Sequence, residues 1–220
     1  MKEVAHIILV GAGGCMRELV WQIQELNKVC PKWHIDGYVD AKVPENESGC
    51  SVGGEWIPYL GTDDYLLALK VRTNVAVCVG NPNLRKKIIK VLRGNPSLVF
   101  PNLILGNTSI CEDVKMGEGC IISMDAKIST NVDIGDFVFL NTGSMICHDG
   151  CVGDFVTLSP NVTLAGNVVV GKESEIGMGA NVIQGSSIGE RAVIGAGAVV
   201  VRDIEAGVTA VGIPARKIKG

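Results

Sequence analysis

His148 is the one of three histidines in the sequence whose neighbours could support proton transfer. Asp149 follows it directly, which brings a carboxylate within reach of the imidazole. An imidazole changes its protonation state near neutral pH and can accept a proton from an attacking amine or hydroxyl, and a carboxylate partner increases its basicity. His148 and Asp149 are therefore candidates for general base catalysis. On residue types alone, an ordinary surface histidine is an equally good interpretation.

The element that must position His148 is a six-residue repeat between Ile104 and Glu205. An aliphatic residue occupies every sixth position, and a small or slim residue follows it four positions later. This period fits neither an α-helix nor a strand meander, but it is typical of a β-solenoid with three hexapeptides per coil. Seventeen hexads predict between five and six coils. At a strand spacing of about 4.8 Å, the prism is roughly 27 Å long.

Stacking between coils predicts the neighbours of His148, because residues eighteen apart in the sequence occupy equivalent places. His148 is third in its hexad and should project outward, between Thr130 on one coil and Gly166 on the next. A glycine beside a base leaves space for an acyl group and brings a backbone N–H close to it. Other recurring glycines are interpreted as corner residues with conformations that β-branched residues do not adopt, namely Gly135, Gly153, Gly171 and Gly189.

The overall composition describes a soluble globular protein, with 47% apolar and 20% charged residues. A formal net charge of −3 argues against a nucleic-acid partner. The eight cysteines form no CxxC pairs, which favours a reducing cytoplasm over a disulfide framework. The start of the sequence lacks the features of a signal peptide, and no stretch is long and apolar enough to cross a membrane. We expect a cytoplasmic protein without a membrane partner.

Residues 1–100 are predicted to form a small α/β domain of the Rossmann-like type, and residues 101–220 the solenoid with its C-terminal tail. Pro101 and Asn102 mark the transition. Alternating apolar runs, turn residues and helical periodicity predict the elements. They are strands at 7–10, 35–40, 75–79 and 98–100, helices at 16–28, 62–69 (capped by Thr62) and 83–93, and a loop at 45–55.

In such a domain, ligands bind where parallel strands end and helices begin. Gly11 and Gly13 form a GxG turn, but Met16 stands where a dinucleotide fingerprint has glycine, so one nucleotide is expected rather than two. Asp40 closes the second strand and can accept hydrogen bonds from a ribose or a base. The alternative is that the glycines only allow close packing and that Asp40 is a turn residue. The expected substrate-binding residues are Gly11, Gly13, Gly14, Asp40, Gly80 and Asn81.

The sequence resembles the sugar O/N-acyltransferases of the sialic acid O-acetyltransferase family, which includes N-acetyltransferases of nucleotide-linked 4-amino sugars. The resemblance spans the chain. It is carried by the stretches 11–14 with Arg17, 37–40, 80–81 with Arg85, 141–149, 152–155, 158–160, 164–168 and 211–215. Single hexads are common to many acyltransferases, but this combination is specific.

The resemblance implies a left-handed parallel β-helix, a handedness that the six-residue period alone does not give. It also implies a homotrimer that binds a nucleotide-activated amino sugar in the N-terminal domain and acetyl-CoA along the prism. By position, His148 is similar to the family's general base, Asp149 and Asn141 to residues that orient it, and the Gly166 N–H to the contact with the thioester carbonyl. No metal is implied.

Contacts with acetyl-CoA are further implied at Gly166, Thr157, Ala180, Ala198, Ile213 and Lys217. Three positions depart from the family pattern. Thr157 stands where many members have a second histidine, Cys15 where a histidine commonly follows the paired glycines, and Ala41 where an acidic residue is frequent. Cys15 is interpreted as a packing residue and not as a nucleophile. The cluster of Arg216, Lys217 and Lys219 is either a phosphate contact or a solvated basic tail.

The sequence therefore predicts an acetyl-CoA-dependent acetyltransferase acting on the amine of a nucleotide-linked 4-amino sugar, in bacterial glycan biosynthesis. Acetylation of a sialic acid or another sugar hydroxyl is the close alternative. A non-catalytic nucleotide-sugar-binding module is a third, because half of the chain is a binding domain. A γ-type carbonic anhydrase shares the solenoid but needs three histidines around zinc, and the predicted solenoid contains only His148.

Overall fold

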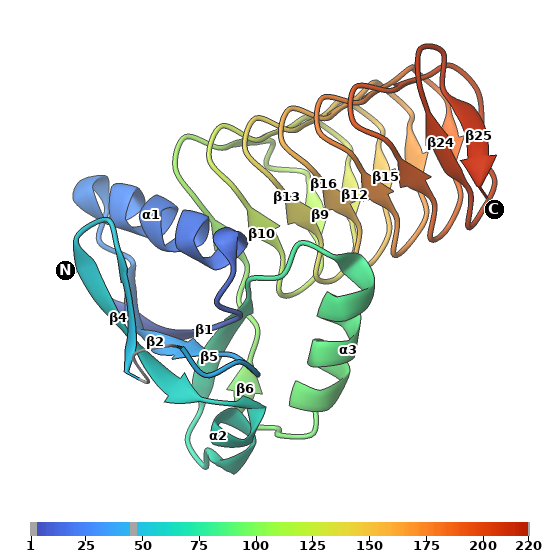
Figure 1. Cartoon of the computed structure of the whole chain (residues 1–220). Coiled ribbons are helices and arrows are strands. Elements are labelled where there is room, and N and C mark those ends of the chain that lie inside the picture. Colours follow the sequence, from blue (N-terminus) through green and yellow to red (C-terminus); the bar gives the residue numbers. More distant parts are fainter. Residues whose placement is uncertain (1–3, 45–47, 220) are drawn as a thin grey trace. The chain divides into compact units, whose positions relative to one another are not determined.

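The computed structural model of the chain describes residues 4–44 and 48–219, which form two compact units (Figure 1). The first, called here the α/β unit, comprises the described residues up to Gly80 together with Leu84–Pro101. The second, called the solenoid unit, comprises Asn81–Asn83 and the described residues from Asn102 onward.

The α/β unit is built on one six-stranded sheet with the order β3-β4-β2-β1-β5-β6. All neighbouring strands are parallel except β3 and β4. The apolar run at the start of the sequence forms the buried end of β1 near the centre of the sheet. The strands are β1 (Ala5–Val10), β2 (Trp33–Val39), β3 (Gly49–Val52), β4 (Glu55–Gly61), β5 (Thr73–Val77) and β6 (Leu98–Val99).

Three helices accompany this sheet, α1 (Gly14–Val29), α2 (Asp63–Ala68) and α3 (Pro82–Leu92). The apolar face of α1 is buried through Met16, Leu19, Val20 and Ile23, as its periodicity predicts. Thr62 is the N-cap residue of α2, but its hydroxyl donates to the Asp64 side chain instead of capping the backbone. All predicted helices and strands of this unit are present, with ends that differ by a few residues.

The predicted loop at 45–55 is wrong in its second half, where a hairpin forms. β3 and β4 pair antiparallel, with Val52 opposite Glu55, and residues 53–54 form the two-residue turn. Gly53 and Gly54 both have positive φ, at +58° and +83°, which is the backbone conformation that tight hairpin turns need. The first part of the predicted loop, residues 45–47, lies outside the described residues.

The solenoid unit consists of seventeen two-residue strands from β7 to β23, three per coil, which gives the predicted five to six coils. One sheet contains β7 (Leu103–Ile104), β10 (Ile121–Ile122), β13 (Phe139–Leu140), β16 (Thr157–Leu158), β19 (Glu175–Ile176), β22 (Val193–Ile194) and then β24 (Thr209–Val211). The second contains β8 (Ser109–Ile110), β11 (Lys127–Ile128), β14 (Met145–Ile146), β17 (Thr163–Leu164), β20 (Asn181–Val182) and β23 (Val199–Val200). The third contains β9 (Lys115–Met116), β12 (Asp133–Ile134), β15 (Cys151–Val152), β18 (Val169–Val170) and β21 (Ser187–Ile188).

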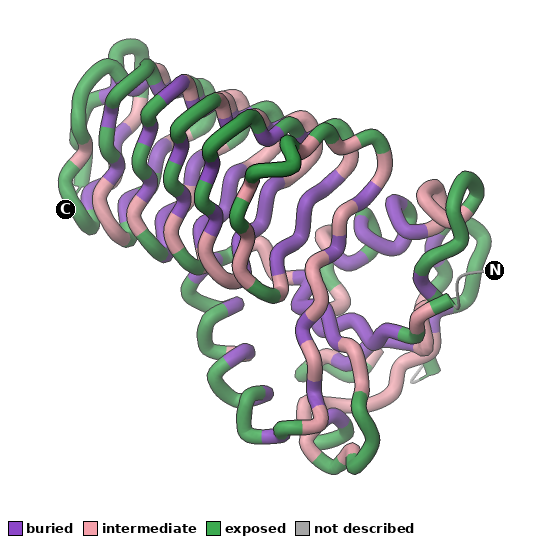
Figure 2. Tube along the Cα trace, turned by 180° about the vertical axis from the view of Figure 1, so that it is seen from behind, coloured by how far each residue is buried: buried purple, intermediate pink, exposed green. Residues whose placement is uncertain are grey.

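Every stacked pair of strands is parallel with a shift of eighteen residues, for example Ile128 beside Ile146 and Ile146 beside Leu164. The aliphatic residues of the repeat and the slim residues four positions later fill the lumen. Figure 2 shows this as buried segments that recur along successive coils. The fold is an α/β domain followed by a parallel β-solenoid of the left-handed β-helix class.

Positive φ angles recur in the fourth position of the hexads, not in the second, where the glycines at 135, 153, 171 and 189 lie. The predicted corner role of these glycines is therefore wrong. They are needed for close packing between coils: a Cβ at Gly153 would lie 2.7 Å from the Lys172 nitrogen, and one at Gly171 would lie 2.5 Å from the Glu190 nitrogen. Asn131 and Asp149 are among the fourth-position residues, with φ of +56° and +59°.

The last coil ends in a hairpin in which β25 (Arg216–Lys219) runs antiparallel to β24. The strand β25 therefore pairs with the edge that the first solenoid sheet would otherwise present. Its residues are exposed, and Lys217 lies 3.7 Å from Glu205. Within the described residues, no helix combines the length and the apolar character needed to cross a membrane.

Candidate active site

His148 and Asp149 lie on the corner between β14 and β15 and project from the prism, as predicted. The imidazole Nδ1 lies 2.7 Å from the Asp149 carboxylate, with half of the His148 side chain exposed. This contact occupies Nδ1 and leaves Nε2 as the nitrogen that can exchange a proton with a substrate. The backbone of Asp149 is in the left-handed conformation.

Asn131 is a residue that the sequence analysis missed. It stacks one coil before Asp149, and its amide nitrogen donates a 2.6 Å hydrogen bond to the second carboxylate oxygen. The backbone N–H of Asn131 is held in turn by Asp113, which also accepts a hydrogen bond from the Thr130 hydroxyl. The hydrogen bond from Asn131, followed by that from His148, holds the pKa of Asp149 below its usual value. Asn131 is thus a positioning residue for the His148–Asp149 pair.

Replacing Asn131 by alanine is expected to lower kcat of the predicted acetyl transfer about three- to tenfold with little change in KM, since one hydrogen bond that orients the predicted base is lost. The pKa of Asp149 should rise toward its ordinary value, because a group whose pKa is lowered by a hydrogen bond loses that shift with the donor. An NMR titration of the Asp149 carboxyl carbon checks this shift. At neutral pH Asp149 stays charged in both proteins, so the difference in kcat at that pH reports the orientation of His148. An unchanged kcat together with an unchanged pKa of Asp149 would contradict the role of Asn131.

Gly166 stacks directly against His148, as the eighteen-residue coil predicts. The Asn167 N–H donates to the His148 carbonyl at 2.9 Å, which fixes the two corners against each other. A Cβ on Gly166 would lie 2.5 Å from Nε2 and 3.0 Å from Nδ1 of the imidazole. Only glycine fits beneath the ring. Among the described residues no acceptor takes the Gly166 N–H, so this donor is available beside the His148 imidazole.

The predicted contact between Asn141 and His148 is not formed within the described chain. Asn141 follows β13 on a different corner of the coil, and its side-chain oxygen accepts a hydrogen bond from the N–H of Thr142 at 2.8 Å. Its role in orienting the base stays a prediction, one that would need a second chain to supply the contact.

The residues predicted to bind the coenzyme lie in several environments. Ala180 and Ala198 are completely buried in the lumen, so only their backbone atoms could contact a ligand. Thr157 is also buried, on β16, whereas Ile213 is 76% exposed. Lys217 is on β25 and is paired with an acidic residue. These positions share a unit with His148, and their contacts with acetyl-CoA stay predictions.

The α/β unit has a pocket of about 360 Å³ where β1 and β2 end. It is lined by Ala12, Gly13, Tyr38, Asp40, Lys42, Val43, Pro44 and Cys50. The Asp40 carboxylate accepts hydrogen bonds from the N–H groups of Ala12 (2.8 Å) and Lys42 (2.7 Å). Asp40 therefore ties the glycine-rich turn to the end of β2. The predicted residues Gly13 and Asp40 are brought together here.

The glycine-rich turn has the geometry of an anion-binding helix start. Gly11 has φ of +107°, a conformation that favours glycine. Gly13 is the N-cap residue of α1 without a side-chain cap, the first turn of α1 has no acidic residue, and the space above Gly13 is open. Gly14 begins the helix. Such a helix start offers backbone N–H groups to phosphate oxygens.

Gly80 and Asn81 follow β5, and the two residues fall in different compact units. The buried Arg85 guanidinium donates to the carbonyl oxygens of Val79 (2.6 Å) and Gly80 (2.9 Å), which fixes the turn after β5. From the sequence, Arg85 was notable only as part of the family resemblance. The structure adds a physical role for it as a buried cation held by backbone carbonyls.

Cys15 lies on α1 next to this turn, and burial, followed by the nearby Glu18, raises the pKa of its thiol to about 12. The buried Cys78 thiol has its pKa raised as well, mainly by burial. A thiol with a raised pKa stays protonated at neutral pH and is a poor nucleophile. This agrees with the packing role predicted for Cys15.

Alkylation by iodoacetamide at pH 8 is expected to spare Cys15 and Cys78 while modifying the exposed thiols of Cys30, Cys111 and Cys151. Mass spectrometry of peptides after timed quenching measures the modified fraction at each cysteine. A Cys15 that reacts as fast as Cys30 in the folded protein would contradict the raised pKa.

Comparison with known proteins agrees with this architecture. Residues 6–92 match the family described as the PglD N-terminal domain. No curated protein sequence matches the chain.

Solved structures that are similar over nearly the whole chain include the following three. A histidine-to-alanine variant of GDP-perosamine N-acetyltransferase from Caulobacter crescentus, solved with CoA and GDP-perosamine, is 30% identical, with a TM-score of 0.85 over 99% of this chain and 98% of that one. The acetyltransferase domain of PglB from Neisseria gonorrhoeae with acetyl coenzyme A is 29% identical (TM-score 0.85; 98% and 100% covered). WeeI from Acinetobacter baumannii is 27% identical (TM-score 0.80; 98% and 100% covered).

These relatives share both units with this chain, in the same order and at nearly the same length. Together with the corner that presents His148 over Gly166, they show that the chain belongs to the NeuD-like family of hexapeptide-repeat sugar acetyltransferases.

Proposed function

We propose that this protein transfers an acetyl group from acetyl-CoA to the amine of a nucleotide-linked 4-amino sugar, with His148 as general base. The observation that carries the proposal is the stacking of the His148 imidazole on Gly166, beside an N–H with no acceptor among the described residues. A base and an unused donor at one bare glycine are the two groups that acyl transfer requires. GDP-perosamine N-acetyltransferase from Caulobacter crescentus, which is similar over nearly its whole length, has CoA and GDP-perosamine bound.

The proposed reaction begins with proton removal by Nε2 of His148, since Nδ1 is held by Asp149. The sugar amine attacks the thioester carbonyl carbon, the C–N bond forms, and the carbonyl oxygen becomes negatively charged. In this proposal the Gly166 N–H stabilises this oxygen by a hydrogen bond. The C–S bond then breaks, and the proton held by His148 passes to the leaving thiolate of CoA. Asp149 stabilises the imidazolium between the two proton transfers.

The nucleotide of the substrate is proposed to bind in the pocket of the α/β unit. The glycine-rich turn with the uncapped start of α1 suits a diphosphate, and Asp40 suits a ribose hydroxyl or a base edge. In the same proposal, Gly80 and Asn81 contact the substrate, and Thr157, Ala180, Ala198, Ile213 and Lys217 contact the coenzyme.

The proposed assembly is a cytoplasmic homotrimer. A base exposed on the outer face of a prism needs a covering surface to exclude water from the thioester. Asn141, which does not meet His148 in its own chain, would then act on the His148 of another subunit. Light scattering tests the assembly: a mass near three times 23.2 kDa at assay concentration supports it, and a monomer contradicts it.

The decisive assay is thiol release from acetyl-CoA against UDP- and GDP-linked 4-amino sugars, with free sialic acid included. Turnover of an amino sugar supports N-acetylation. Turnover of sialic acid alone would replace this proposal by O-acetylation, the alternative that shares the same base and donor. Tight binding of a nucleotide sugar with neither binding nor consumption of acetyl-CoA would indicate a non-catalytic binding module.

A further inference from the structure

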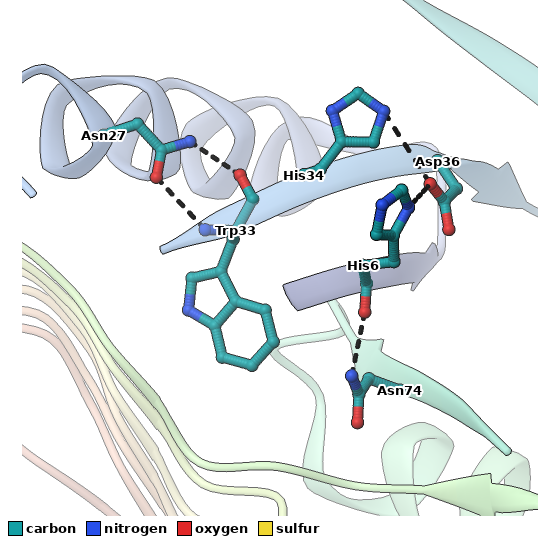
Figure 3. Close-up of polar contacts among 6 residues, drawn as sticks. All are labelled: His6, Asn27, Trp33, His34, Asp36 and Asn74. Atoms are coloured by element: carbon teal, nitrogen blue, oxygen red, sulfur yellow. Dashed lines mark hydrogen bonds and ion pairs between the residues drawn. The ribbon is translucent and has the colours of Figure 1, made fainter. Parts of the chain in front are cut away.

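His6, His34 and Asp36 form a cluster in the α/β unit that the acetyl transfer does not use (Figure 3). His6 is the second residue of β1 and His34 the second residue of β2, and the parallel register places them side by side. The two rings lie 4.9 Å apart in an edge-to-face arrangement. The side chains of His6 and His34 are exposed, and that of Asp36 is partly exposed.

A bulge in β2 brings Asp36 to the two histidines. Ile7 pairs with Ile35 and Ile8 with Gly37, so Asp36 is the extra residue without a partner on β1. Bulges of this kind redirect a side chain from its regular alternation. The Asp36 carboxylate oxygen lies 2.6 Å from Nδ1 of His6 and 3.8 Å from Nε2 of His34.

The backbones that carry these side chains are themselves fixed. The Asn74 amide donates to the carbonyl of His6 at 2.9 Å. The Asn27 side chain bonds both the N–H (3.2 Å) and the carbonyl (2.7 Å) of Trp33, the residue before His34 (Figure 3). Ligands on braced strands lose little freedom when they bind an ion, so the cluster is preorganised.

From this geometry we infer a binding site for a divalent transition metal such as Zn²⁺, with His6, His34 and Asp36 as its protein ligands. The three ligand atoms lie within 4.8 Å of one another. With metal–ligand bonds of about 2.0–2.1 Å, the ligand atoms of a tetrahedral site are about 3.3 Å apart. This value lies between the distances from the Asp36 carboxylate to His6 (2.6 Å) and to His34 (3.8 Å). Two imidazoles and one carboxylate suit zinc, cobalt or nickel better than magnesium or calcium, which prefer oxygen ligands. The exposed side leaves a coordination position for water.

The inferred metal would tie β1 to β2 at their amino ends. The proposed nucleotide pocket lies where the same strands end, beyond Gly11 and Asp40. The metal is therefore assigned a structural role that does not depend on the proposed acetyl transfer. A metal that binds only the folded protein raises its melting temperature.

The test is a titration of the full-length, chelator-treated protein with Zn²⁺ by calorimetry and with Co²⁺ by absorbance. We expect one ion per chain and a Co²⁺ visible spectrum of nitrogen and oxygen ligation, without the near-ultraviolet thiolate band that cysteine ligands give. His34→Ala and Asp36→Asn should each weaken binding at least about tenfold. Loss of a residue that only hydrogen-bonds to a metal ligand already costs about that much, and loss of the ligand itself should cost no less. Zn²⁺ should raise Tm of the unmodified protein and not that of His34→Ala.

His148→Ala is the matched control, because it removes the remaining histidine of the sequence, and it should bind as tightly as the unmodified protein. Circular dichroism establishes that each variant is folded, and His6→Ala provides a second ligand deletion on the other strand. Lack of stoichiometric binding would overturn the inference. So would a thiolate band, loss of binding in His148→Ala, or unchanged affinity in folded His34→Ala and His6→Ala proteins.

Discussion

Replacing His148 by alanine is expected to lower kcat of the proposed acetyl transfer by about 10²- to 10⁴-fold, the range that a positioned general base contributes. Asp149 and Asn131 remain in the variant, but neither can replace Nε2 beside Gly166. KM for acetyl-CoA should change much less than kcat, because the lost group acts on the proton and not on coenzyme binding. Steady-state thiol release at saturating substrate measures both constants.

The control for this prediction is Glu112→Ala, an exposed residue in the same third hexad position two coils earlier. It should retain the kcat of the unmodified protein. Because His148 is exposed on the outside of the prism, its removal leaves the lumen intact, and Tm should hardly change. A folded His148→Ala protein that keeps near-normal kcat would eliminate His148 as the base.

Gly166→Ala is expected to reduce kcat by about 10²- to 10³-fold, because blocking access to the Gly166 N–H should cost about as much as losing an oxyanion donor. The new methyl group would lie 2.5 Å from Nε2, so the imidazole must move. It would also fill the space above the Gly166 N–H where the acyl oxygen is proposed to bind. The His148 side chain is half exposed and lies outside the lumen, so its displacement should have a small effect on Tm.

A double variant separates this steric effect from general damage. If Gly166→Ala acts by displacing His148, it should have a much smaller effect in the His148→Ala background than alone. If Gly166→Ala lowers kcat by the same factor with and without His148→Ala, its effect arises from blocking the N–H or the acyl space and not from displacing His148. A Gly166→Ala protein with unchanged kcat would contradict the proposed use of this corner.

The solenoid and its exposed corner were predictable because the repeat itself fixes the geometry. An aliphatic residue every sixth position specifies which side chains enter the lumen, and three hexads per coil specify which residues stack. This was sufficient to place Gly166 against His148. The same arithmetic applied to Asp149 would have identified Asn131, eighteen residues earlier, so that residue was missed although the signal was present.

The hairpin β3–β4 was missed for a different reason. Pro58 and the polar residues around 45–55 are typical of a loop, whereas the strands depend on pairing that local sequence does not specify. Gly53-Gly54 between two short alternating runs was the available signal for a two-residue turn. The local sequence also does not show why glycine is needed at 135, 153, 171 and 189, because the atoms that a Cβ would meet there belong to the next coil.

The sequence predicted where the binding residues of the α/β unit lie, but not which atoms they contact. Strand ends and glycines indicate where a nucleotide can bind, and Asp40 does line the pocket. That its carboxylate is already hydrogen-bonded to two backbone N–H groups is a tertiary feature. The His6–His34–Asp36 cluster depends on strand register and a bulge, which the sequence does not specify.

The hairpin at the end of the solenoid has a consequence for solubility. A stack of identical parallel coils can in principle grow without limit, because the last coil offers the next chain the same unpaired backbone groups that hold its own coils together. By reversing direction, β25 pairs antiparallel with the edge of the first solenoid sheet, where a parallel strand of another copy would otherwise add. The hairpin therefore blocks coil-on-coil growth along one of the three solenoid sheets.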